Sequence, residues 1–122
     1  MTNAAYIDGF TFPIAKAGLA NYQKLAAAIA EIWLEYGALE YREFVGDDMQ
    51  LEGTRSFTDV INADQNEVTV FGWVAFESRE VRDRINRQVA GDKRVAELMT
   101  NTHSNFDAAR MTYGGFRSLV GD

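Results

Sequence analysis

The 122-residue chain contains no cysteine, one histidine and one proline. Without cysteine it has no disulfide, no thiolate nucleophile and no cysteine-ligated metal. The single histidine, His103, excludes metal sites and proton relays built from several histidines. Glycine-rich phosphate loops and the helical His-Glu-x-x-His pattern are also missing. We therefore expect neither a bound metal nor a cofactor.

Long hydrophobic runs and an excess of positive charge are missing too. No run approaches the ~20 residues of a membrane-spanning helix, and the N-terminus lacks the basic segment and apolar stretch of a signal peptide. These features predict a cytoplasmic protein without a membrane partner. Acidic residues number 18 against 12 lysines and arginines, which gives a net charge of -6. Because this charge repels phosphate, we expect no nucleic-acid partner.

Lysines and arginines gather only between residues 79 and 94. A phosphate-binding surface would keep one sign of charge along such a segment. Here Glu80, Asp83 and Asp92 interrupt the basic residues. The mixture predicts a solvated helix face instead.

The length and composition are those of one globular domain. Domains cluster near ~100–150 residues, so we expect residues 1–122 to form a single domain, which the order of elements described below predicts to be ferredoxin-like. The hydrophobic fraction of 47% and the charged fraction of 25% are typical of soluble folded proteins.

The segment Glu67–Phe76 is hydrophobic on both of its alternating faces. In an extended chain, successive side chains point to opposite faces. One face carries Val68, Val70, Val74 and Phe76, and the other carries Phe71, Trp73 and Ala75. This pattern predicts a central strand that is covered on both sides.

Two strands and a helix are predicted ahead of this segment. Residues 5–12 alternate as a strand, which Pro13 ends. Residues 17–36 carry an apolar stripe at spacings of three and four, which predicts a helix with Gly37 as its C-terminal cap. Residues 38–45 alternate as a half-exposed or edge strand.

The connection over residues 46–66 is longer than most loops. Its centre, residues 55–61, fits either a short edge strand or a helical turn. A connection of this length is either functional or packs on a partner subunit.

Two helices and a strand are predicted after the central strand. Ser78 is expected to cap a helix that stops at Gly91, and Asp92 is expected to cap a second, short helix. The last strand is expected over residues 110–119. The pair Gly114-Gly115 at its centre indicates a bulge or a site of close packing.

The order of these elements predicts an α+β protein of the ferredoxin-like βαββαβ class with an antiparallel four-stranded sheet. Its helices then cover one face of the sheet. The other face would expose large hydrophobic side chains of the central strand. Two copies packed sheet to sheet would bury these side chains, so we expect a homodimer, a dimeric α+β barrel.

Short motifs along nearly the whole chain resemble one family. They are Tyr6-x-Asp8-Gly9-Phe10, Gly37-Ala38-Leu39, Gly46-Asp47-Asp48, the strand leading into Trp73, Glu80-Val81-Arg82-Asp83 and Phe106-Asp107-x-x-Arg110-Met111-x-Tyr113-Gly114-Gly115-Phe116. Together they resemble the YbaA-like family, small uncharacterised bacterial proteins with a domain of unknown function. The sequence departs from that family in the middle loop and at Ala109, where a basic residue is usual.

The resemblance implies a fold and an assembly but no reaction. YbaA-like proteins look like members of the dimeric α+β barrel superfamily, which implies the same homodimer. That superfamily includes cofactor-independent monooxygenases, muconolactone-isomerase-like enzymes, haem-degrading enzymes and ligand-binding stress proteins. Because one fold serves many functions, no catalytic residue is carried over.

Three polar residues are candidates for chemistry: Asp8, His103 and Arg110. Asp8 and Arg110 are expected on neighbouring strands, where they would meet either as a structural ion pair or with Asp8 as a base in a cavity. His103 lies in a polar segment and would need an orienting partner such as Asp107 to act as a base. A solvated loop histidine is the alternative.

Four aromatic residues on predicted strands are candidates for ligand binding: Phe10, Phe71, Trp73 and Tyr113. Such residues either stack on a planar ligand or fill the core. Three hypotheses follow: a homodimer that binds a small, largely apolar molecule in a sheet–helix or barrel cavity, a cofactor-independent monooxygenase- or isomerase-like enzyme, and a structural dimer with a filled core. A cavity of roughly a few hundred Å³ would separate the third hypothesis from the other two.

Overall fold

The computed structural model describes residues 4–102 and 104–121. Its strands are β1 (Tyr6–Ala15), β2 (Glu40–Val45), β3 (Glu67–Phe76) and β4 (Thr112–Arg117). Its helices are α1 (Leu19–Glu35), α2 (Phe57–Val60), α3 (Arg79–Ala90) and α4 (Lys93–Asn101), with short 3-10 turns at Lys16–Gly18 and Ala108–Arg110. No helix in the described ranges is long and apolar enough to cross a membrane.

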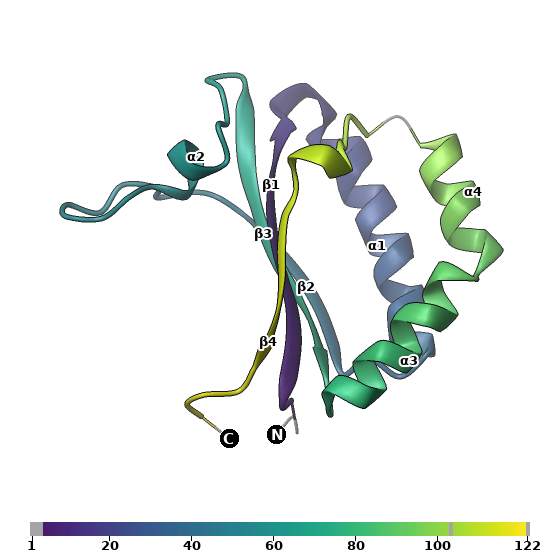
Figure 1. The fold of residues 1–122 in the computed structure, drawn as a ribbon. Coiled ribbons are helices and arrows are strands. Elements are labelled where there is room, and N and C mark those ends of the chain that lie inside the picture. Colours follow the sequence, from purple (N-terminus) through teal and green to yellow (C-terminus); the bar gives the residue numbers. More distant parts are fainter. Residues whose placement is uncertain (1–3, 103, 122) are drawn as a thin grey trace.

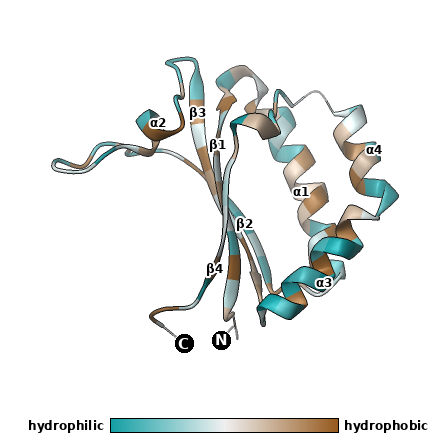
Figure 2. Ribbon diagram, in the orientation of Figure 1, coloured by the Kyte–Doolittle hydropathy of each residue, from teal (hydrophilic) through white to brown (hydrophobic). Residues whose placement is uncertain are grey.

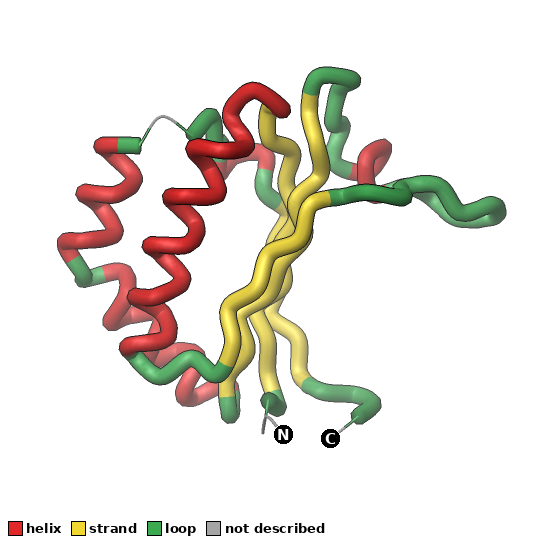
Figure 3. Tube along the Cα trace, turned by 180° about the vertical axis from the view of Figure 1, so that it is seen from behind, coloured by secondary structure: helices red, strands yellow, loops and turns green. Residues whose placement is uncertain are grey.

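The four strands form one antiparallel sheet in the order β2-β3-β1-β4. Helices α1, α3 and α4 cover one face of this sheet, while α2 and the connection that contains it lie on the opposite side (Figure 1). Seen from behind, the connection after β2 extends away from the sheet and the helical layer (Figure 3). This arrangement confirms the predicted ferredoxin-like α+β class, with β1 and β3 as the central strands.

Helix boundaries follow the predicted capping residues. Gly37 has a φ of 111°, a left-handed conformation that ends α1. The Ser78 side chain accepts a hydrogen bond from the Val81 N–H at the start of α3. Asp92 does the same for α4 through the Arg94 N–H. These caps confirm where the sequence places the helix ends.

The strand ends differ from the predicted ones. Strand β1 continues through Pro13 to Ala15. Proline has no N–H to donate, but β4 pairs with β1 only as far as Thr11, so no hydrogen bond to β4 is lost at Pro13. The segment around 55–61 is a helical turn, which decides between the two alternatives above. Strand β4 is shorter than expected, because residues 108–110 form a 3-10 turn.

The hydrophobic core lies between the sheet and the helices and has two parts. One part contains Phe12, Ile14, Tyr22, Leu25 and Val70, and the other contains Ala38, Val74, Phe76, Ile85 and Val89. Phe10 packs against both parts. Figure 2 shows hydrophobic residues along the sheet and hydrophilic residues over much of α3, so the outer side of this helix faces solvent.

The glycines of β1 and β4 lie where large rings approach the backbone. Gly9 is paired with Gly114, and a side chain at either position would crowd the Phe116 ring. A Cβ at Gly115 would overlap the Tyr6 hydroxyl. The strands stay in regular register across the glycine pair, so close packing, not a bulge, explains these glycines.

Candidate functional site

A pocket of about 280 Å³, which we call the interior pocket, lies between the sheet and the helical layer. It is partly open to solvent, since Tyr113 and Met99 in its lining are 51% and 43% exposed. Its walls are mainly aromatic and aliphatic side chains from β1, β2, β3, α1, α4 and the segment before β4. They are Phe10, Phe12, Tyr22, Leu25, Ala26, Ile29, Trp33, Tyr41, Val74, Met99, Phe106 and Met111. Asp8, Asn86 and Tyr113 supply the polar part of the lining. Ligand sites combine apolar walls with a few polar groups in this way.

Asp8 is the centre of the polar part. Strand β1 alternates, so Asp8 shares the helix-facing side with Phe10, and only 4% of its surface is exposed. Its Oδ1 accepts hydrogen bonds from Arg82 Nη1 at 2.9 Å and from the Tyr113 hydroxyl at 2.7 Å. Its Oδ2 accepts one from Asn86 Nδ2 at 3.3 Å. A buried carboxylate held by three donors is charge-balanced and fixed in orientation.

Arg82 joins α3 to three strand residues at once. Its guanidinium lies 4.9 Å from the centre of the Tyr6 ring, a cation–π contact. Nη2 donates to the Tyr6 hydroxyl at 3.2 Å, and Nη1 lies 2.7 Å from the Tyr113 hydroxyl. Because the Arg82 side chain is only 12% exposed, the interpretation of this segment as a solvated helix face is wrong for Arg82.

Tyr113 lies on β4, the strand next to β1, and its side chain extends to Asp8. Its backbone is paired with Phe10, two residues along each strand from the pair formed by Asp8 and Gly115, so both pairs lie on the same face. Burial and the hydrogen bond to Asp8 raise the pKa of Tyr113 to about 12. The hydroxyl is therefore protonated at neutral pH and acts as a hydrogen-bond donor inside the site.

The expected pair of Asp8 and Arg110 is wrong. Arg110 lies before β4 in a 3-10 turn and binds Glu67 at 2.6 Å, at the opposite end of β3 from Val74, the residue paired with Asp8. The hydrogen bonds from Arg110 and from the Asp64 N–H lower the pKa of Glu67. Asp8 takes its cation from α3 instead, and sequence alternation along the strands gave no sign of this.

The four aromatic candidates divide between the two faces of the sheet. Phe10 and Tyr113 line the interior pocket. Phe71 and Trp73 lie on the opposite face, with ring centres 6.2 Å apart, so they do not contact Asp8. The candidate His103 lies outside the described residues.

A second polar cluster was missed by the sequence reasoning. Glu43 on β2 accepts hydrogen bonds from the hydroxyls of Tyr22 and Tyr41. Burial raises the pKa of Glu43, and the two tyrosine hydrogen bonds act in the opposite direction. The available signal was that Glu43 is two residues from Tyr41 and from Val45, which places all three on the side of the sheet that faces α1.

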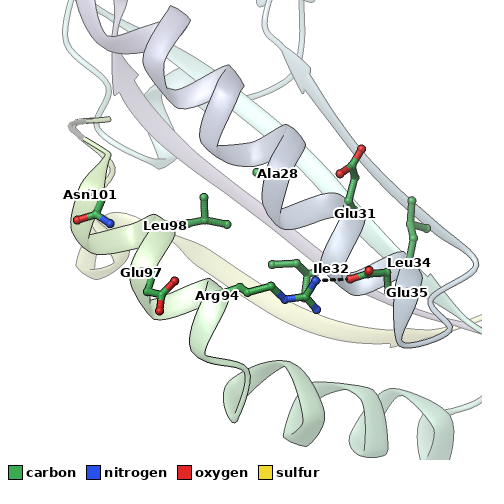
Figure 4. Close-up of a pocket in the computed structure, with 9 residues that line it drawn as sticks. All are labelled: Ala28, Glu31, Ile32, Leu34, Glu35, Arg94, Glu97, Leu98 and Asn101. Carbon is green, nitrogen blue, oxygen red and sulfur yellow. Dashed lines mark ion pairs between the residues drawn. The ribbon is translucent and has the colours of Figure 1, made fainter.

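A larger hollow, a groove of about 850 Å³, lies on the outer surface between α1 and α4 (Figure 4). Its charged side chains are Glu31, Glu35, Arg94 and Glu97. Arg94 and Glu35 form an ion pair of 2.8 Å while both remain about half exposed, so water screens them. In the described part of the chain no three histidine or acidic side chains gather closely enough to hold a metal ion. The Asp8 carboxylate of the interior pocket is thus buried and fixed by hydrogen bonds, whereas the charged groups of the outer groove are exposed to solvent.

Comparison with known proteins identifies the family. Residues 5–108 match the family described as "Protein of unknown function (DUF1428)". The chain is 34% identical to "Uncharacterized protein YbaA" of Escherichia coli strain K12 over 115 residues, which cover 94% of this chain and 97% of the relative. The chain belongs to this family. The YbaA protein of Shigella flexneri matches to the same extent, and the resemblance expected from the motifs is confirmed.

A solved structure supports the fold of this DUF1428 protein independently. The crystal structure of a NIPSNAP family protein with unknown function from Agrobacterium tumefaciens superposes with a TM-score of 0.63. The match covers 97% of this chain and 91% of the other at 13% sequence identity. At this identity the similarity establishes the α+β fold and leaves the function open.

Replacing Asp8 with Asn should destabilise the protein by about 3 kcal/mol, because it leaves the Arg82 charge buried without its partner. Urea unfolding at neutral pH measures this change. Asp83→Asn is the matched control: it removes the other carboxylate near Arg82, which lies 2.9 Å from Nε but is 44% exposed, and should cost at most about 1 kcal/mol. Equal effects of the two variants would contradict the central role of Asp8.

The stabilising contribution of Glu43 should fall as the pH rises. Because its pKa is higher in the folded chain, the folded state holds the Glu43 proton more tightly than the unfolded state. The contribution is therefore complete below the ordinary glutamate value of 4.5 and is lost as the pH rises through the raised value. Urea unfolding of wild type and Glu43→Gln across this range measures the difference, with Glu31→Gln on the outer surface of α1 as the control. If the stability of the wild type relative to Glu43→Gln increased with pH, this assignment would be contradicted.

Proposed function

We propose that this protein is a homodimer that binds a small, largely apolar molecule in the interior pocket. The observation that carries the proposal is the pocket itself, about 280 Å³ with aromatic and aliphatic walls around one polar cluster. A volume of this order accommodates a small organic molecule. A filled core, which the structural-dimer hypothesis requires, does not match such a cavity.

The polar cluster favours a ligand that carries a hydrogen-bond donor. Oδ1 of Asp8 already accepts two hydrogen bonds, whereas Oδ2 accepts one long bond from Asn86. A carboxylate oxygen has two lone pairs, so Oδ2 retains room for an O–H or N–H group. The preferred ligand is then an apolar body with one hydroxyl or amine-type N–H, oriented by Asp8.

The open face of the sheet supports the homodimer. Phe44, Phe57, Phe71 and Phe116 are each 40% or more exposed. Phe44 packs against Trp73 with ring centres 5.3 Å apart, and Phe57 packs against Phe71 at 5.5 Å. An aromatic surface of this kind is typical of an interface. A second copy of the chain, related by a two-fold axis, supplies a matching aromatic surface.

A second candidate function is proton-transfer catalysis without a cofactor, of the isomerase or monooxygenase kind. The observation in its favour is that Asp8 and the Tyr113 hydroxyl lie together in the pocket lining, 2.7 Å apart. Asp8→Asn separates the two functions in a chain that remains folded: a binding protein keeps its ligand, and an enzyme that uses Asp8 as its base loses turnover. The cytoplasmic location stays a prediction from the sequence.

Phe71→Glu should shift the protein from dimer to monomer, because it places a charge in the aromatic surface. Sedimentation equilibrium measures the mass against the 13.7 kDa chain. Leu34→Glu is the matched control: Leu34 is 44% exposed and Phe71 40%, but Leu34 lies on α1 in the outer groove. A wild-type protein that is monomeric at all concentrations would contradict the proposed dimer.

The interior pocket should bind 2-naphthol more tightly than naphthalene, by about fivefold or more, through one hydrogen bond to Asp8. Heteronuclear NMR titration measures both affinities and maps the shifted amides. Ile29→Phe, which fills the pocket, should abolish binding, whereas Leu34→Phe on the outer surface should not. Shifts confined to the open sheet face or the outer groove would contradict the proposed binding site.

A further inference from the structure

A third hollow, a groove of about 350 Å³, lies between α1 and the edge strand β2. Its apolar lining comes from both elements and from β3: Leu19, Ala26, Ala27, Ala30, Val45 and Val70. Tyr22 and Tyr41 line this groove and also line the interior pocket, so they form the wall between the two. The groove is therefore a separate hollow with its own polar side chains, Gln23 and the carboxylate of Glu43.

Glu43 differs from Asp8 in having no cation. Among the described residues the groups that contact its carboxylate are the hydroxyls of Tyr22 and Tyr41, one on each oxygen, and none of the ion pairs found there includes Glu43. One donor on each oxygen leaves a lone pair free on each. A half-buried carboxylate in this position is incompletely neutralised, and a positive charge delivered through the groove would stabilise it.

We propose that the groove between α1 and β2 binds a small alkylammonium compound, with the ammonium group on Glu43 and the alkyl chain along the apolar lining. An ammonium group offers three donors on a compact charge, which matches the two oxygens that still have a free lone pair. The faces of aromatic rings attract cations, and Tyr22 and Tyr41 flank the carboxylate.

The other carboxylates in hollows of this protein lack this combination. Asp8 in the interior pocket is already neutralised by Arg82 at 2.9 Å. Glu35 in the outer groove is 56% exposed and is paired with Arg94. Glu31 and Glu97 line the same groove and are exposed to solvent. The inference is independent of the proposed function, because it concerns a different hollow. Its ligand is a cation, whereas the proposed ligand of the interior pocket is neutral.

The test is an NMR titration of the full chain with hexylammonium chloride and, separately, hexan-1-ol. Hexylammonium should shift amides of β2 and α1 and bind about tenfold or more tightly than the alcohol, as expected for a charge-assisted contact. Glu43→Gln should remove this preference. Glu31→Gln, which removes the same charge from the outer surface of α1, should retain it.

Equal affinity for amine and alcohol in the wild type would overturn the proposal, as would shifts that map to Glu31, Glu35 and Glu97 in the outer groove. Tyr41→Phe covers the case in which Glu43→Gln does not fold. This variant keeps the carboxylate and loses one of its donors, so it should keep the preference for hexylammonium. Loss of the preference in Tyr41→Phe would count against the assigned role of Glu43. Binding of 2-naphthol in the interior pocket is measured on the wild type and does not depend on these results, which separates this proposal from the proposed function.

Discussion

The buried ion pair between Asp8 and Arg82 fixes the helical layer to the middle of the sheet. Burying two charges is costly unless they are paired at short distance and their other hydrogen bonds are satisfied. The structure meets this condition by adding Tyr113 and Asn86 to the carboxylate and Tyr6 to the guanidinium. These groups come from β1, β4 and α3, so the position of α3 over the sheet depends on a network that closes only in the folded chain.

Glycines make room for this network. Gly115 is paired with Asp8, and a side chain there would overlap the Tyr6 hydroxyl that Arg82 contacts. Gly72 has the same role under the neighbouring cluster: a Cβ would lie 2.8 Å from the Phe10 ring and 2.9 Å from Glu43 Cγ. Both glycines occupy strand positions where their low β propensity is a disadvantage. For Gly115 the cause is the Tyr6 side chain. For Gly72 it is the two side chains together with the Arg42 carbonyl oxygen, which would lie 2.6 Å from an added Cβ.

The sequence was sufficient for the fold because the relevant patterns are local. The two-sided hydrophobic pattern of β3, the stripe of α1 and the caps at Ser78 and Asp92 depend only on nearby residues. The strand limits at Pro13 were wrong, because they depend on where β4 stops pairing. The partner of Asp8 was also wrong: Arg82 and Asn86 are four residues apart on α3, and their approach to β1 depends on helix packing that residue spacing does not describe.

The two carboxylates on the helix-facing side of the sheet have the same sequence pattern but different surroundings. Asp8 and Glu43 are both acids that share one face of a strand with hydrophobic residues, so the sequence pattern does not distinguish them. Asp8 pairs with Val74 and Glu43 with Gly72, two residues along β3. Within the described part of the chain, an ion pair forms at Asp8 and none at Glu43. The interior pocket therefore presents a neutral polar cluster at Asp8, which suits a neutral donor. The groove at Glu43 presents a negative charge shared with two tyrosines, which suits a cation. Under the two proposals, the position of one arginine on α3 would decide which kind of ligand each hollow prefers.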